Sequence, residues 1–444
     1  MMLHEPDWSP QMLAEIGVNA ETVQQLDAFL EEYLAYYRGC YQRSEQRRHV
    51  ETYIKGLLSD LDCKSIEPIA LRYHEEKAVR PMQLFMKNSP WRGQEQMRCM
   101  YQQRVSSVAN DPNGMLTVDG SDYPKKGSHS VGVARQHCGI LGKTENCQAG
   151  VFIGYSGSQG YGLLDCRLYL PQKWFTEEYR DTRIRCGVPD NVVFATKNQL
   201  ATEMINLVLA SGHFQARWIG CDSAFSSDQK FRDSLPPGYW LFGDIHATQL
   251  VWRTRPEWAT PEYAGWGRRP KKPVPSPAPV SVETIANDDS LSWQTVRLAE
   301  GAKGPIMAKV KICRVVEYRD GQPGDEVWLY VRKYENGRIK YSISNAPADI
   351  PIEELHRAAI LRWPIEQSFE ECKSFLGMDH YEARSWNAWH RHMLFVFIAH
   401  LFTLEVRVRF KRKLTMPQAC RLIRAAFTRD LSRIRKTIDD LFTT

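Results

Sequence analysis

Near residue 106 the chain changes from helical periodicity to short runs of β-forming residues, and the order of these runs leaves few possible folds. The predicted elements are strands at 115–119, 149–156 and 161–170, a helix at 197–211 capped by Thr196, a strand at 216–222, a short helix at 228–235 and a strand at 239–245. The turn GSQG joins the second and third strands, which predicts a hairpin. Three strands followed by helix, strand, helix and strand indicate a single α/β sheet.

The segments on either side of this region have different patterns. Residues 8 to about 105 are polar and helix-patterned, which predicts a separate helical domain. After the last strand comes a proline-rich segment, Arg268 to Val280, and then alternating strand runs at 305–318, 326–334 and 338–344. The last two runs are joined by the hairpin turn Glu335-Asn336-Gly337. We therefore predict an all-β insertion, with the proline-rich segment as a surface linker.

A helix is predicted after the insertion, and it places a carboxylate between cations. At about 100° per residue, Arg362, Glu366 and Lys373 fall together beside an apolar stripe. The stripe consists of Ile365, Phe369, Cys372 and Leu376. This pattern suits a metal ion and a phosphodiester, but a solvated face with ordinary ion pairs has the same pattern. Pro364 suits the first turn of a helix or a kink, which would place Arg362 just before the helix.

Acidic residues occupy matching places on this predicted scaffold. Asp119 ends the first strand, Asp222 ends the fourth, and Glu366 lies on the helix that follows the insertion. If the three carboxylates converge at one end of the sheet, they can hold two divalent ions, Mg²⁺ or Mn²⁺ as its substitute. An Asp at a strand end is commonly a cap or turn residue, so each assignment has a purely structural alternative. Asp122 lies three residues beyond Asp119, and we assign it to the following loop.

Charge and cysteine content restrict the partners and the compartment. The net charge is +6, and between Leu401 and Lys436 eleven Lys or Arg residues oppose only Glu405 and Asp430. This basic segment favours a polyanion such as nucleic acid, although a basic solvated helix has the same composition. The eleven cysteines include no CxxC pair, so we expect reduced thiols in a cytoplasm, without disulfides or structural zinc.

The most apolar run gives no reason to expect a membrane protein. Residues 393–404 are too few to span a bilayer and are interrupted by His400, so we predict a buried helix. We find no targeting segment.

Three segments together resemble a known family, the DDE transposases of bacterial insertion sequences, in the branch with a β-strand insertion before the final Glu. They are VDGSDYPKKGSHSVGVARQHCGILGKTENCQAGVF at 118–152, CDSAF at 221–225 and RWPIEQSFEECKSFLGMDHYEARSWNAWHRH at 362–392. The resemblance covers roughly residues 30 to 430 and implies that the catalytic Asp, Asp and Glu are Asp119, Asp222 and Glu366. A related signature of Tyr, Arg, Glu and Lys places Arg362 and Lys373 beside Glu366, but its Tyr position is Ala359 here.

The resemblance also implies the fold class and suggests domain boundaries. The expected fold is α/β, with an RNase H-like mixed-sheet catalytic core, an all-β insertion, an N-terminal helical domain and a basic helical C-terminus. The expected units are a helical DNA-binding domain at 1–105, the core at 106–247, the insertion at 248–348, the rest of the core with the catalytic Glu at 349–392, and the basic helical region at 393–444.

The function implied is that of a DNA transposase. It would bind the terminal inverted repeats of its element, cleave DNA with two Mg²⁺ ions and transfer the 3′-hydroxyl ends to target DNA, as at least a homodimer on double-stranded DNA. It would act in a bacterial cytoplasm, at the nucleoid when bound to DNA. Alternatives are an RNase H-like nuclease without strand transfer, or a domesticated DNA-binding regulator without catalysis.

Several side chains outside the triad are candidates for DNA contact. Arg362 and Lys373 would hold phosphates near the cut, and Lys125 and Lys126 would reach phosphates from the loop after the first strand, unless that loop is only a solvated turn. Three tryptophans near the start of the insertion are candidates for stacking on a flipped base, with core packing as the alternative. They are Trp252, Trp258 and Trp266.

Overall fold

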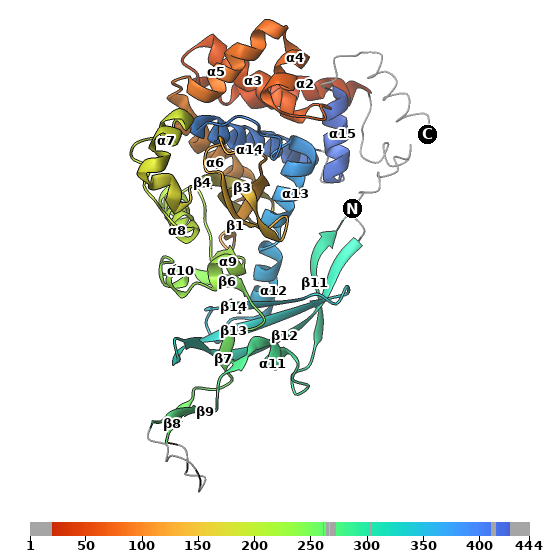
Figure 1. Ribbon diagram of the computed structural model, residues 1–444. Coiled ribbons are helices and arrows are strands. Elements are labelled where there is room, and N and C mark those ends of the chain that lie inside the picture. Colours follow the sequence, from red (N-terminus) through yellow and green to blue (C-terminus); the bar gives the residue numbers. More distant parts are fainter. Residues whose placement is uncertain are drawn as a thin grey trace.

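The computed structural model describes residues 20–260, 262, 266, 272–301, 304–409 and 414–426. Figure 1 shows an elongated molecule, with most helices gathered around one part of the sheet and the strands of the insertion extending away from them. The architecture is mixed α/β, as predicted. One twelve-stranded sheet runs through both parts.

The catalytic part of the sheet has the strand order and directions of an RNase H-like core. Its strands are β1 (Met115–Pro124), β3 (Lys143–Ser156), β4 (Tyr161–Tyr169), β5 (Trp218–Cys221) and β6 (Trp240–Ile245). They lie in the order β4-β3-β1-β5-β6. Strand β3 is antiparallel to both β4 and β1, whereas β5 is parallel to β1 and β6 is parallel to β5. A further strand, β2 (Ala134–Cys138), pairs with β3.

The local predictions in this region hold with two corrections. The GSQG hairpin between β3 and β4 is confirmed, and so is the Thr196 cap, whose hydroxyl accepts a hydrogen bond from the backbone N–H of Gln199. The prediction that the first strand ends at Asp119 is wrong. β1 continues to Pro124, and Asp122 lies within it opposite Ala149, because the long strand β3 supplies pairing partners along the whole segment. The fourth strand begins at Trp218 rather than at residue 216.

Helices cover both the sheet and one another. The N-terminal helices are α2 (Ala20–Ala35), α3 (Ser44–Leu58), α4 (Ile66–Tyr73), α5 (Val79–Asn88) and α6 (Gly93–Ala109), with short 3-10 turns at Arg38–Cys40 and Glu76–Ala78. Within the core lie α7 (Arg180–Cys186), α8 (Lys197–Ala210), α9 (Ser223–Ser226) and α10 (Gln229–Asp233), with 3-10 turns at Gln172–Phe175 and Glu177–Tyr179. After the insertion come α12 (Ile352–Leu361), α13 (Pro364–Leu376), α14 (Trp386–Arg409) and α15 (Met416–Ala426).

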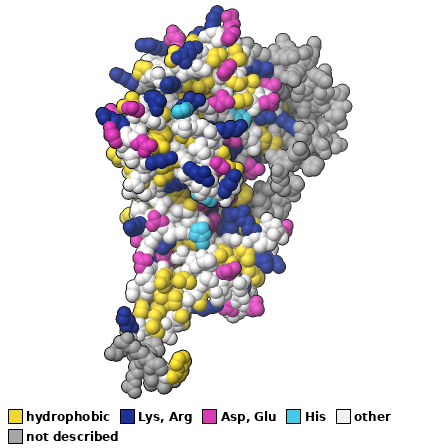
Figure 2. Space-filling model, viewed as in Figure 1, with side chains coloured by type: hydrophobic (Ala, Val, Ile, Leu, Met, Phe, Trp, Pro, Cys, Tyr) yellow, Lys and Arg dark blue, Asp and Glu magenta, His cyan; other side chains and the backbone are white. Residues whose placement is uncertain are grey.

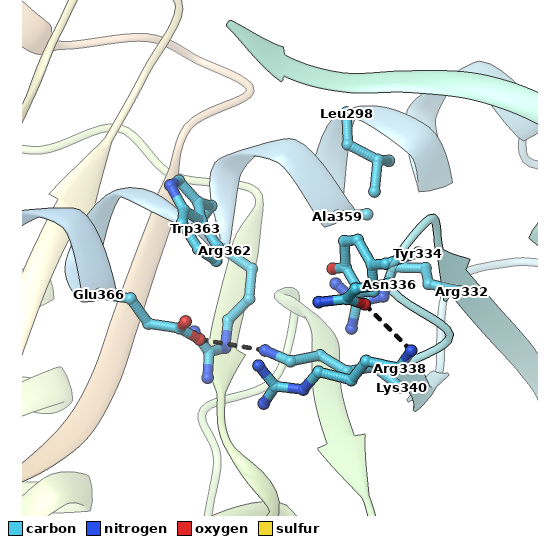
Figure 3. A pocket seen from close by; sticks show the side chains of 10 residues that line it. All are labelled: Leu298, Arg332, Tyr334, Asn336, Arg338, Lys340, Ala359, Arg362, Trp363 and Glu366. Atoms are coloured by element: carbon cyan, nitrogen blue, oxygen red, sulfur yellow. Dashed lines mark hydrogen bonds and ion pairs between the residues drawn. The ribbon is translucent and has the colours of Figure 1, made fainter. Parts of the chain in front are cut away.

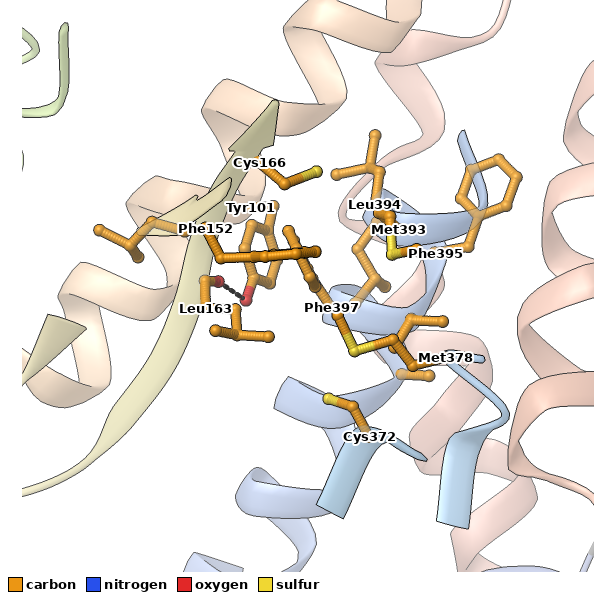
Figure 4. Close-up of a cluster of buried hydrophobic side chains, with 14 of the residues drawn as sticks. Tyr101, Phe152, Leu163, Cys166, Cys372, Met378, Met393, Leu394, Phe395 and Phe397 are labelled. Atoms are coloured by element: carbon orange, nitrogen blue, oxygen red, sulfur yellow. Dashed lines mark hydrogen bonds between the residues drawn. The ribbon is translucent and has the colours of Figure 1, made fainter. Parts of the chain in front are cut away.

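The N-terminal helices share one hydrophobic core with the catalytic sheet. Helix α14, which contains the predicted buried run 393–404, passes between them and the sheet, and the Tyr33 hydroxyl donates to the carbonyl of Ile398 on α14. Figure 4 shows α14 side chains, among them Phe397, packed toward Tyr101 of α6 and Phe152 of β3. The helices therefore bury their apolar faces against α14 and do not form a separate core.

The insertion extends the catalytic sheet. Its long strands are β11 (Gln294–Gly301), β12 (Gly304–Arg319), β13 (Gln322–Tyr334) and β14 (Ile339–Ser344), and shorter ones are β7 (Leu250–Trp252) and β10 (Val280–Ser281). Strand β14 is antiparallel to β6, with Ser342 opposite Asp244. The β13–β14 hairpin turns at Gly337, as predicted, with φ of +79°.

The insertion also contains a helix, which we did not predict, and a pair of strands that lies apart from the large sheet. The insertion is not all β, because α11 (Val282–Ala286) packs its apolar side chains on the strands. The hairpin of β8 (Glu257–Ala259) and β9 (Val274–Ser276) forms a separate two-stranded sheet.

In the part of the chain that the structure describes, no helix is long and apolar enough to cross a bilayer. Much of the basic segment predicted near the C-terminus, at 410–413 and 427–444, lies outside the described residues. Within them, α15 joins the shared core through Leu422 and Ile423.

Candidate active site

Three aspartates lie at the same level of three adjacent parallel strands. Val118 of β1 is in register with Cys221 of β5, and Cys221 is in register with Gly243 of β6. The residues that come next in the sequence are Asp119 on β1, Asp222 directly after the end of β5, where it caps α9, and Asp244 on β6. Because in-register residues of neighbouring strands project from the same face, the sheet brings these carboxylates together.

Glu366 reaches the same place from the junction of two helices. Arg362 caps the C-terminus of α12, and Pro364 occupies the first turn of α13, as its fixed φ favours. The backbone stays helical through the junction, so Arg362 and Glu366 keep their i,i+4 relation, and Arg362 Nη1 lies 2.9 Å from Glu366 Oε1. The predicted apolar stripe is confirmed, since Ile365, Phe369, Cys372 and Leu376 are all buried.

The carboxylates surround one cavity of about 420 Å³, which is lined by Asp119, Asp222, Asp244, Arg362 and Glu366 among others. Figure 2 shows Lys and Arg side chains gathered at the level where the insertion joins the rest of the molecule. The triad proposed from the sequence thus lines a single space open to solvent, at the border between the catalytic strands and the insertion.

Arg362 is the central cation of this cluster. Its side chain is only 3% exposed, and Nη2 lies 3.7 Å from Asp119 Oδ2 and 3.8 Å from Asp244 Oδ2. Burial lowers the pKa of the Arg362 guanidinium, but Asp244, Asp119, Glu366 and Asp222 outweigh burial and raise it above its ordinary value. Arg362 therefore stays charged and neutralises carboxylates that would otherwise repel one another.

The carboxylates respond differently to this environment. Burial raises the pKa of Asp119 to about 7, with Arg362 opposing and Asp222 and Glu366 adding to the rise. Burial also raises the pKa of Asp222. Burial acts in the same direction on Glu366, but Arg362 and Lys340 outweigh it and hold its pKa below the ordinary value. Carboxylates with such separated affinities for protons are typical of functional sites.

Asp244 is the acidic residue that we did not predict. Its carboxylate accepts hydrogen bonds from Arg332 and from the Ser342 hydroxyl, the latter at 2.6 Å. Burial raises its pKa, but Arg332, Arg362 and Lys340 together with the Ser342 hydrogen bond lower it to about 2. The sequence did contain a signal for Asp244. It follows Gly243 near the end of a predicted strand, just as Asp119 follows Val118 and Asp222 follows Cys221.

A cationic pocket of about 160 Å³ adjoins Glu366 on the side of the insertion. Figure 3 shows Arg332, Arg338 and Lys340 of the β13–β14 hairpin opposite Arg362 and Glu366. Lys340 Nζ lies 3.3 Å from Glu366 Oε1 and 3.7 Å from Asp244 Oδ2. The insertion therefore supplies cations to the site, which the sequence alone did not indicate.

The predicted lysines are placed unequally. Lys126 is exposed. Lys125 is half-buried and its Nζ donates to the carbonyl of Tyr381 at 2.5 Å, so the structure gives it a protein partner. Lys373 is half-buried over the ring of Tyr123, at 5.6 Å from the ring centroid, and burial lowers the pKa of its ammonium group.

The three tryptophans do not gather at the site. Trp252 is fully buried on β7 and packs against Tyr318, so its ring has no face free for a base, and core packing is the correct interpretation for this residue. Trp258 and Trp266 are 44% and 83% exposed. Among the described residues that line the two cavities beside Glu366, none is one of these tryptophans.

The donor set suits a hard divalent cation, because Asp119, Asp222 and Glu366 offer only oxygen ligands around a solvent-open cavity. Within the described ranges, no three Asp, Glu, His or Cys side chains are close enough together to hold an ion as they stand. The position of Arg362 explains this spacing, since its guanidinium lies between Asp119 and Glu366. The residues fit a metal if Arg362 releases them.

Two family profiles match the chain. The profile of the family described as "DDE superfamily endonuclease" matches residues 36–305, and that of the family described as "Transposase DDE domain" matches residues 294–402. No curated protein sequence matches the chain. Among solved structures, the cryo-EM structure of the piggyBac transposase synaptic complex with hairpin DNA has a TM-score of 0.40 and 10% identity, over 100% of this chain and 86% of that chain. Because the first profile covers more than half of the chain and the second adds the segment with Glu366, this chain belongs to the DDE superfamily of endonucleases and is a DDE transposase.

Proposed function

We propose that this transposase binds the terminal inverted repeats of its own bacterial insertion sequence, cuts the DNA there and joins the freed 3′-hydroxyls to target DNA, by a cut-and-paste route. The observation that carries the proposal is that Asp119, Asp222 and Glu366, far apart in the sequence, line one cavity. Members of the superfamily generally depend on divalent metals, and an oxygen-only triad is the donor set that such ions prefer.

The three carboxylates would act as the catalytic metal ligands. Asp119, Asp222 and Glu366 would hold two Mg²⁺ ions, or Mn²⁺ in their place, which supply activation of the attacking water or 3′-hydroxyl and stabilisation of the leaving oxygen. Arg362 would turn from Asp119 and Glu366 toward a DNA phosphate while Asp244 remains beside it as a carboxylate partner.

The cations around the cavity would position the DNA backbone. Lys340 and Arg338 of the insertion line the cavity. Lys373 lies over Tyr123 near the end of β1, and Lys126 follows that strand. Phosphate contacts of this kind fix the register of the duplex but carry no sequence information. We assign end recognition to the N-terminal helices, and further phosphate contacts or a subunit contact to the basic C-terminal region.

Two ends must be brought together for cut-and-paste transposition, so we propose a homodimer on double-stranded DNA, acting at the nucleoid in a bacterial cytoplasm. Of the three tryptophans predicted to stack on bases, Trp258 and Trp266 remain candidates, because their side chains are exposed whereas Trp252 is buried.

The test is cleavage and joining of labelled DNA that carries the ends flanking the reading frame, with Mg²⁺, for the wild type, Glu366→Gln and Asp222→Asn. We expect the wild type to release and join 3′ ends, and both variants to bind the same DNA with their cleavage rate reduced at least about a hundredfold.

Other outcomes identify the alternatives. A wild type that cuts but does not join would be a nuclease without strand transfer. Binding without cutting under either Mg²⁺ or Mn²⁺ would identify a domesticated DNA-binding regulator, and full activity in both variants would refute the triad.

A further inference from the structure

A groove of about 810 Å³ lies between the N-terminal helices and the catalytic core, and its lining shares no residue with the cavity at the carboxylates. One wall comes from α4 and α5, with Arg80 and Lys87. The other comes from α7 and from the connection that precedes α14, with Arg185 and Arg384, and His129 lies in the loop after β1.

The groove is cationic and its cations are exposed, although one of them, Arg185, donates a hydrogen bond to the Thr182 hydroxyl at 3.2 Å. Arg80, Lys87, Arg185 and Arg384 are all exposed, against two lining carboxylates, Glu67 and Glu382. Across the described ranges, none of these four cations has a carboxylate within ion-pair distance, unlike Arg72, Arg98 or Arg104 of the same helical region. Unpaired cations on opposing walls favour a ligand with several negative charges.

The walls of the groove are held in a fixed relation. Buried Arg391 of α14 donates to the carbonyls of Phe85 and Met86 near the end of α5 and, at 2.7 Å, to that of Ser89. On the opposite wall, the backbone N–H of Val131 donates to the carbonyl of Arg384 at 3.0 Å. The cations thus project from a preformed surface, which lowers the entropy lost on binding.

Basic side chains lie along the course from the groove to the carboxylates, together with one carboxylate, Asp122 of β1. Strand β1 carries Asp119 at its centre and ends at Pro124, a span of about 17 Å at roughly 3.3 Å per residue. Lys373 lies over Tyr123 near the end of this strand, Lys126 follows it, and His129 lines the groove. A duplex that runs parallel to β1, at about 3.4 Å per base pair, would reach the end of this strand about five base pairs from a cut at the carboxylates, and the groove lies beyond that end.

We propose that this groove binds backbone phosphates of the DNA duplex, at least about five base pairs from the cleaved bond. The inference rests on the proposed function, because the occupant is identified as DNA by the activity of the neighbouring site. The repeated phosphates of a duplex match cations on two walls, and such contacts are independent of base sequence.

The experiment measures how the affinity for a labelled end duplex changes with salt concentration, for the wild type and three double variants. The groove variant is Arg185→Gln/Arg384→Gln, and the charge-preserving variant is Arg185→Lys/Arg384→Lys. The control, Arg135→Gln/Arg180→Gln, removes two exposed arginines outside the groove, one of them on α7. The slope of log K against log salt is negative, and a loss of two phosphate contacts should reduce its magnitude by about 1.8. Binding should become roughly tenfold weaker.

We expect that only the groove variant binds more weakly and with a smaller salt dependence than the wild type. When the duplex is shortened to about four base pairs beyond the cut on one side, the groove variant and the wild type should bind with equal affinity. The lysine variant should retain the wild-type slope, which separates charge from folding. If the groove variant has the wild-type slope while the wild type binds and cuts the ends, the proposal that DNA binds in the groove is wrong and the proposed function still stands. A wild type that neither binds nor cuts the ends would overturn both.

Discussion

At the residue scale, the site depends on a buried arginine among four carboxylates. Arg362 ion-pairs with Glu366 and lies within 4 Å of carboxylate oxygens of Asp119 and Asp244, so it provides the positive charge that the cluster needs when it holds no ion. Asp244 belongs to the same cluster but is already satisfied by Arg332 and Ser342. We therefore assign Asp244 to positioning of the cations rather than to metal binding.

Asp119→Asn should stabilise the protein in metal-free buffer. The raised pKa, about 7 in the folded state against about 3.9 in an unfolded chain, means that ionising Asp119 costs stability as pH rises from about 4 to 7. The amide avoids this cost, so the free energy of unfolding at pH 7.5 should increase by up to about 4 kcal/mol. Urea unfolding at pH 7.5 and at pH 4.5 checks this. The difference between variant and wild type should shrink at the lower pH, and a variant less stable at pH 7.5 would contradict the electrostatic argument.

Asp244→Asn should have the opposite effect. Its lowered pKa means that the carboxylate stabilises the folded protein at all pH values above about 4, and that this contribution is lost as pH falls through about 2. Loss of the charge leaves Arg332, which is 3% exposed, without its buried partner, so we expect about 3 kcal/mol of destabilisation by urea unfolding at pH 7. The control is Asp233→Asn. The Asp233 side chain is 51% exposed and pairs with Arg319, so this change should lower the free energy of unfolding by less than about 1 kcal/mol. Equal effects of the two substitutions would be evidence against the buried network.

At the scale of single elements, helix ends decide how α13, the helix that carries Glu366, is held. Helix α13 ends at Gly377 with φ of +66°, in the left-handed region that glycine favours. Beside this end, buried Lys64 donates to the carbonyl of Phe375 at 2.7 Å and to carbonyls at the end of α3. The N-terminal helices thereby contact the helix that carries Glu366.

Gly377→Ala should destabilise the protein more than the same change at the end of α7. Gly187 has an equivalent φ of +67°, but an added Cβ there meets open space, whereas at Gly377 it would lie 2.7 Å from Lys64 Cβ. We expect about 1–2 kcal/mol for Gly187→Ala from backbone strain alone, and at least about 1 kcal/mol more for Gly377→Ala. Thermal unfolding of both variants checks the difference, and equal losses would show that the contact with Lys64 relaxes freely.

At the scale of the whole molecule, the insertion and the catalytic core are one structure. Strand β14 covers the edge of β6, and the hairpin it forms with β13 places Arg332 and Lys340 at the carboxylates. Among the described strands, by contrast, β8 and β9 pair with each other and with no other strand.

Replacing residues 248–344 with a short linker should therefore yield an aggregating protein, because it leaves β6 with an unpaired edge. Replacing only residues 257–276, which include β8 and β9, should leave a monodisperse protein with a melting temperature within about 3 °C of the wild type. Size-exclusion chromatography and thermal unfolding distinguish the two deletions. A soluble, folded protein after the larger deletion would show that the core does not need β14.

The sequence by itself determined the features that depend on local chemistry. The helical and alternating patterns, the Thr196 cap, the Gly337 turn and the apolar stripe of α13 were predictable, because each follows from side chains within a few residues. The motifs around Asp119, Asp222 and Glu366 indicated the family for the same reason.

Only the tertiary structure decided which distant groups meet. A strand edge can accept any partner strand, so the sequence did not indicate that β14 would pair with β6, or that β1 would continue along β3 to Pro124. A charged side chain likewise carries no local signal of the charges it will face. The places of Asp244 and Lys340 at the cavity therefore followed only from the packing of the sheet, the insertion and α13.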